Sequence, residues 1–87
     1  MKDHTMFSKQ LTLRGQARQF CVTTAAASGW EIQVSEGDRV VRRTGYTDWH
    51  RLERGMNAIE LEIAELEARG WHVSASAGEV GAQSTNR

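Results

Sequence analysis

The sequence contains no proline, a single cysteine and no excess of either charge. Cys21 has no partner for an internal disulfide bond, and a lone thiol is typical of a reducing compartment, so we expect a cytoplasmic protein. Eleven basic and eleven acidic residues cancel each other. This balance removes any overall electrostatic attraction to nucleic acid or to a membrane surface.

Long apolar runs are missing as well. Nowhere do about 18 apolar residues follow one another, which is the length that a membrane-spanning helix needs. Residues 1–5 lack the apolar stretch of a secretion signal. We therefore expect neither membrane insertion nor secretion.

The sequence also lacks the patterns of common catalytic sites. It has no glycine-rich phosphate loop, no nucleophile elbow and no paired-carboxylate arrangement. His4, His50 and His72 lie far apart, so no two of them have the four-residue spacing of a helical metal site. Asp48 and His50 are only two residues apart, which on a helix points them in different directions. We expect no catalytic residue, metal ion or cofactor, and hence no enzyme.

What is present describes one small domain. With 87 residues, 39% hydrophobic and 25% charged, the chain has the composition of an ordinary globular protein. Beyond residue 73, Val80 is the only large apolar residue, so we expect a single domain over residues 6–72 and a flexible tail over 73–87. A core of this size is marginal without a disulfide, a metal or a partner.

Three segments alternate apolar with polar residues and predict strands over 9–14, 18–23 and 30–35, and the β-branched residues of 39–44 predict a fourth. Short connections favour an antiparallel meander, because parallel pairing needs long crossovers. The adjacent Val40 and Val41 leave the inward face of the fourth strand undecided. The alternation predicts that five large apolar side chains share the covered face. These are Phe20, Val22, Trp30, Ile32 and Val34.

A long helix over residues 48–69 is the strongest signal in the sequence. Six apolar residues recur at spacings of 3, 4, 3, 4 and 3, namely Trp49, Leu52, Met56, Ile59, Ile63 and Leu66. Thr47 or Asp48 can cap its first turn, and Gly70 stands where a left-handed residue ends a helix. Gly55 lies inside the pattern at a cost of about 1 kcal/mol relative to alanine. The predicted fold is α+β: a four-stranded antiparallel meander followed by one amphipathic helix.

The length of this helix predicts a homodimer. It spans about 33 Å, whereas six-residue strands reach only about 20 Å, so an apolar stripe would project beyond the sheet. A second copy would cover it, and the dimer interface would consist of the same six residues from Trp49 to Leu66. Leu61, Ala64 and Ala68 lie on the opposite side, and the sequence leaves open which face meets the sheet. Basic residues early in the helix and glutamates late in it favour an antiparallel pair.

Four strands followed by a long dimerising helix, with Trp49 near its start, resemble the positive-cofactor-four and Whirly types of single-stranded-DNA-binding proteins. The resemblance covers residues 9–69 and rests on the order of the elements. It implies a basic channel across the strands of a dimer, drawing on Lys9, Arg14, Arg18, Arg39, Arg42 and Arg43. The face opposite Phe20 and Trp30 offers few aromatic side chains on which bases could stack.

Two functions follow from these observations. The first is a small non-enzymatic dimeric module that binds another protein or serves as a regulatory subunit. The alternative is a single-stranded nucleic-acid-binding protein that uses the six basic residues. Shared architecture alone does not decide between them.

Overall fold

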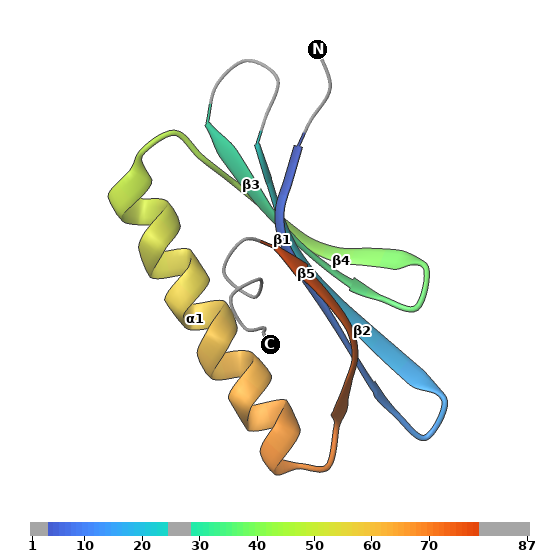
Figure 1. Ribbon diagram of the computed structural model, residues 1–87. Coiled ribbons are helices and arrows are strands. Elements are labelled where there is room, and N and C mark those ends of the chain that lie inside the picture. The colour runs from blue at the N-terminus through green and yellow to red at the C-terminus, as the bar shows by residue number, and fades with distance from the viewer. Residues whose placement is uncertain (1–3, 25–28, 79–87) are drawn as a thin grey trace.

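The computed structural model describes residues 4–24 and 29–78, which form one antiparallel sheet and one helix (Figure 1). In chain order the elements are β1 His4–Leu13, β2 Gln16–Thr24, β3 Trp30–Glu36, β4 Arg39–Tyr46, α1 Trp49–Ala68 and β5 His72–Gly78. The five strands lie in the order β4-β3-β2-β1-β5. The predicted α+β class and four-stranded meander are therefore confirmed, and the sheet has one strand more than expected.

The fifth strand corrects the predicted end of the domain. Residues 73–78 were expected in a tail, but they pair with β1 in antiparallel register, with Thr12 opposite His72 and Phe7 opposite Gly78. The segment carries only small side chains after Val73, so its order comes from backbone pairing and not from buried apolar surface. Residues 79–87, the rest of the predicted tail, lie outside the described residues.

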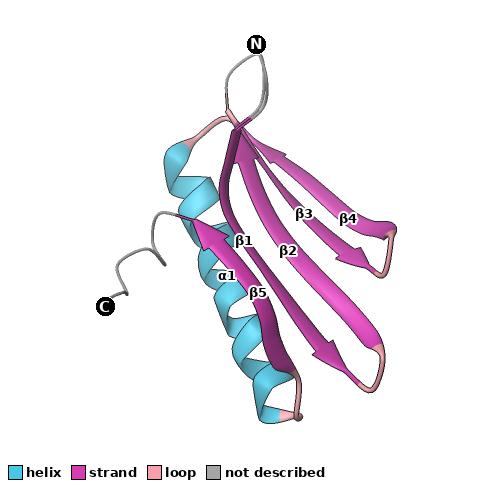
Figure 2. Ribbon diagram, turned by 45° about the vertical axis from the view of Figure 1, so that its right-hand side comes forward, coloured by secondary structure: helices cyan, strands magenta, loops and turns pink. Residues whose placement is uncertain are grey.

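Tight turns close two hairpins of the meander, the one between β1 and β2 and the one between β3 and β4. Arg14 and Gly15 both have positive φ, at 53° and 83°, which is the geometry of a two-residue loop that matches the twist of the strands. Gly37 opens the second turn at φ 65°. Both turns lie at the same end of the sheet (Figure 2).

The ends of α1 follow from its capping residues. Asp48 is the N-cap, and its carboxylate accepts a 3.4 Å hydrogen bond from the backbone N–H of His50. At the other end Gly70 adopts φ 104°, and the N–H of Trp71 donates to the carbonyl of Leu66 at 3.0 Å. This is the left-handed ending that the sequence predicted.

The core lies between α1 and one face of the sheet (Figure 2). Its most buried side chains are Leu11, Phe20, Val22, Ile32, Val34, Leu52, Ile59, Ile63 and Leu66. Of the five predicted covered residues, Trp30 alone is half-buried, and it packs edge-on against Trp49 with ring centroids 5.3 Å apart. The two tryptophans close the core where α1 begins.

Irregularities in the strands explain the positions that alternation left ambiguous. The register between β3 and β4 steps from Arg42 to Val40, so Val41 is an extra residue, and both valines are exposed. A similar step near Met6 lets both Met6 and Phe7 pack against the core. Strict two-residue alternation cannot predict either case.

Gly55 lies against the side chains of Tyr46 on β4 and Ile32 on β3. A Cβ atom at this position would sit 2.6 Å from the Tyr46 hydroxyl oxygen and 3.0 Å from Cδ1 of Ile32. The glycine that weakens the helix by its propensity therefore allows the helix to approach the sheet.

Candidate binding surfaces

The apolar stripe of α1 belongs to the core of its own chain, which corrects the predicted dimer interface. Leu52, Ile59, Ile63 and Leu66 are between 0% and 6% exposed, and Met56 is partly buried against the same cluster. Trp49, at 44%, is the only exposed member. A partner could reach Leu52, Ile63 and Leu66 only if the helix left its sheet.

The helix also lacks the overhang beyond the sheet from which that interface was predicted. The strands contain 7 to 10 residues and so reach about 23 to 33 Å, while the 20 residues of α1 span about 30 Å. Helix and sheet are therefore matched in length. The opposite helix face carries a single large apolar residue, Leu61, which is 72% exposed and lines a shallow hollow with Ala58, Glu62 and Glu65.

Three of the six basic residues predicted to bind nucleic acid are held in ion pairs. Arg18 lies 2.7 Å from Glu36, Arg42 lies 2.8 Å from Glu62, and Arg43 lies 3.4 Å from Glu31. Arg42 thereby links β4 to the helix. These arginines have carboxylate neighbours that compete with any phosphate group.

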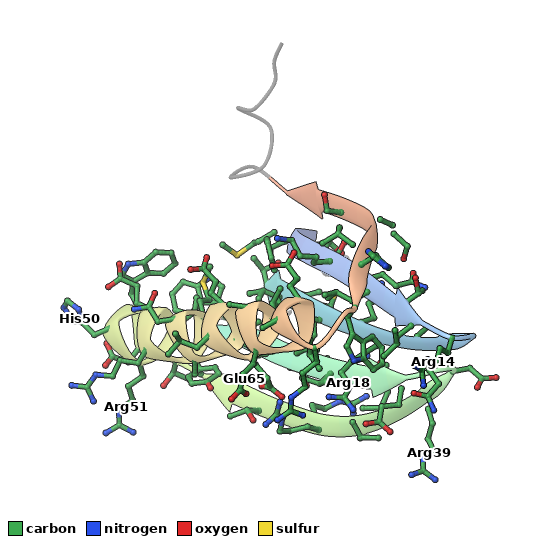
Figure 3. All side chains as sticks on the ribbon, turned by 90° about the horizontal axis from the view of Figure 1, so that it is seen from below. Arg14, Arg18, Arg39, His50, Arg51 and Glu65 are labelled. Atoms are coloured by element: carbon green, nitrogen blue, oxygen red, sulfur yellow. The ribbon has the colours of Figure 1, made fainter. Side chains whose placement is uncertain are left out.

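The structure does not gather the six residues into one channel. Arg14 and Arg39 lie at the hairpin end of the sheet, and Arg18 lies nearby (Figure 3). Arg42 shares the helix-covered side with Val34, its cross-strand partner, whereas Arg43 lies on the other side of β4. The amino group of Lys9 lies 5.9 Å from the centroid of the Phe7 ring.

A groove at the hairpin end is built around Arg18. Its guanidinium lies 5.5 Å from the centroid of the Trp71 ring, and the groove is lined by Gly15, Gln16, Ala17, Arg18, Glu36, Gly37 and Trp71. Nε of Arg18 is buried and has no hydrogen-bond partner among the residues described. With Arg18 and Glu36 paired, the groove has little net charge, and the buried Nε is closed to a ligand.

The sheet face opposite the helix is polar and nearly uncharged. One row across the strands consists of Ser8, Cys21, Gln33 and Arg43, and a second contains Gln10, Gln19 and Ser35. Burial raises the pKa of the Cys21 thiol, and a hydrogen bond with Thr5 partly opposes the shift. The thiol therefore stays protonated, which lowers its reactivity.

The two edges of the sheet differ in charge. β4 carries Arg39, Arg42 and Arg43, and charged edge strands resist pairing with other chains. β5 carries no lysine, arginine, aspartate or glutamate, and no further strand lies beside it in the described part of the chain. Residues 72–76 are exposed. The sequence analysis did not predict this strand, although the alternation of serine with alanine over 74–77 is a pattern that a strand can have.

A strip of the helix-side sheet face is also uncovered. The helix backbone lies nearest to β3 and β4, and the edge strand β5 on the other side is more exposed than Leu11 of β1, which the core covers. Val73 is 41% exposed although it lies opposite Leu11, which is fully buried. Further along β1, Phe7, Val22, Met56, Ile59 and Glu60 line a small, mainly apolar depression.

Residues 4–24 and 29–78 contain no group of three or more histidine, cysteine, aspartate or glutamate side chains placed to hold a metal ion. No helix in those ranges is long and apolar enough to cross a membrane. Comparison of the chain with protein-family models, with curated proteins and with solved structures found no match.

Proposed function

We propose that the protein is a small, non-enzymatic homodimeric binding module and that two copies join through their β5 edges. The observation that supports this proposal is the β5 edge, which is uncharged and has no neighbouring strand among residues 4–24 and 29–78. A strand with free backbone N–H and C=O groups is a template for another strand, and monomeric proteins usually protect it with charge. In this sheet only the β4 edge carries such charge.

The β5 sequence suits pairing with its own copy. A two-fold axis perpendicular to the sheet places two β5 strands antiparallel, and no like charges then face each other. Serine and alanine allow close approach of the backbones. The result is a continuous ten-stranded sheet with both helices on one side, running antiparallel as the charge pattern of the helix suggested.

Analytical ultracentrifugation tests the dimer. We expect wild-type protein to sediment as a dimer at micromolar concentration and Ala75→Lys to sediment as a monomer, because the substitution puts a charge on each facing strand. Val40→Lys, on the already charged β4 edge, is the matched control and should remain dimeric. Wild-type protein that stays monomeric at high micromolar concentration would refute the proposal, and equal effects of both variants would place the interface elsewhere.

The ion pairs of Arg18, Arg42 and Arg43 support this proposal over the single-stranded nucleic-acid alternative. A fluorescent oligonucleotide of thymidines at low salt tests that alternative. Salt-dependent binding that weakens in Arg42→Ala or Arg43→Ala, but not in Arg51→Ala on the exposed helix surface, would revive it. We expect no such binding.

A further inference from the structure

The uncovered strip beside α1 has an apolar floor. Phe7 on β1 and Val73 on β5 lie on the helix side of the sheet, with Val73 opposite Leu11, four residues further along β1 than Phe7. Met56 of the helix and Phe7 line a depression of only about 20 Å³, which suits the tip of one apolar side chain and not a small-molecule ligand. The floor therefore fits a macromolecular partner.

One wall of the strip is acidic. Glu60 lines the depression, and Glu53 and Glu67 lie seven residues before and after it, so the three carboxylates follow one line along the helix. All three are exposed. Within the described ranges Glu60 and Glu67 have no ion-pair partner, whereas Glu62, on the β4 side, is paired with Arg42.

The two sides of the helix thus differ. Figure 3 shows Arg51 and Glu65 on the side of α1 that faces β4. On the β5 side Glu60 and Glu67, which have no ion-pair partner within the described ranges, run beside partly exposed apolar side chains. Lys9 of the neighbouring β1 strand lies on the same side of the sheet, with its amino group 5.9 Å from the centroid of the Phe7 ring. An apolar floor with an acidic rim is complementary to a segment with one apolar and one cationic face.

We propose that this strip binds an amphipathic, cationic helix of a protein partner. The inference rests on the proposed dimer, because pairing of β5 strands joins the strips of two copies into one trough. The four central strands of that trough span about 14 Å, and a helix with its side chains is about 10 to 12 Å wide. Apolar side chains of the partner contact Phe7, Met56 and Val73, and its lysines or arginines face the glutamates.

The test uses a fluorescein-labelled 18-residue peptide in which leucines recur at helical spacing and all other positions are lysine. A second peptide replaces every lysine by glutamate. We expect anisotropy to report binding of the lysine peptide alone, with Glu60→Lys weakening it at least tenfold. Glu65→Lys is the matched charge reversal on the other side of the helix and should change the affinity less than threefold. Val73→Ser should weaken binding, and Val40→Ser should not.

Each contrary result has a separate meaning. Equal weakening by Glu60→Lys and Glu65→Lys would show attraction to charge anywhere on the helix and would overturn the strip as the site. A wild-type dimer that binds neither peptide would overturn the inference and leave the dimer intact. Full-strength binding to the monomeric Ala75→Lys variant would overturn the two-copy trough.

Discussion

At the scale of single residues, Gly55 has a packing role that its helix propensity conceals. The Tyr46 hydroxyl oxygen would lie 2.6 Å from an added Cβ atom. We expect Gly55→Ala to lower the free energy of unfolding by about 1 to 3 kcal/mol, because overpacking outweighs the gain of about 1 kcal/mol in helix propensity. Urea denaturation measures the change.

The same contact supplies the control for that substitution. Tyr46→Phe removes the hydroxyl oxygen, so Gly55→Ala should cost less in a Tyr46→Phe background than in the wild type. If Gly55→Ala instead raised the stability, the close approach of helix and sheet would be wrong.

Phe20 and Trp30 differ in burial although the sequence predicts the same face for both. Phe20 is fully buried, whereas Trp30 is half-buried beside Trp49. We expect Phe20→Ala to cost about 3 to 5 kcal/mol and Trp30→Ala to cost less, because a partly solvated site leaves a smaller cavity. Chemical denaturation of both variants under the same conditions gives the order. If Trp30→Ala lowered the free energy of unfolding more than Phe20→Ala, the main core would lie at the start of the helix.

At the scale of elements, the junction between α1 and β5 depends on Gly70. Its φ of 104° disfavours any side chain, although a Cβ atom there would meet only Leu13 Cδ1 at 3.8 Å. We expect Gly70→Ala to destabilise the fold by about 1 to 2 kcal/mol through backbone strain alone. Gly45→Ala is the control, since Gly45 has neither a positive φ nor a neighbour within 4 Å. If Gly70→Ala and Gly45→Ala lowered the melting temperature by similar amounts, the explanation by backbone strain at Gly70 would be wrong.

The elements were predictable to different degrees for physical reasons. Alternation over 18–23 and 30–35 and the spacing from Leu52 to Leu66 depend on neighbours in the sequence, so these elements and the inward faces of the two strands followed directly. β5 was missed because alanine and serine bury little surface and its partner, β1, is distant in the chain. The apolar stripe was recognised, but the pattern is the same whether a helix meets its own sheet or a second copy.

At the scale of the whole molecule, the zero net charge conceals an uneven distribution that only the fold reveals. Arg42 pairs with Glu62 and Arg43 with Glu31, so the β4 side is largely neutralised. The side toward β5 has the uncharged edge, and Glu60 and Glu67 there have no ion-pair partner in the described part of the chain. No spacing rule predicts such pairs, because the partners come from different elements. The candidate binding surfaces therefore emerged from the structure and not from the motifs.

The pairing of β5 with β1 also determines which contact forms last when the chain folds. The meander and helix can form from contacts between successive segments, but the register of Phe7 with Gly78 joins strands from near the two ends of the chain. That contact closes the longest loop in the fold and carries the largest entropic cost of closure. During synthesis β1 therefore remains an open edge until residue 78 has left the ribosome. A nascent chain stalled earlier exposes an unpaired strand that is prone to association.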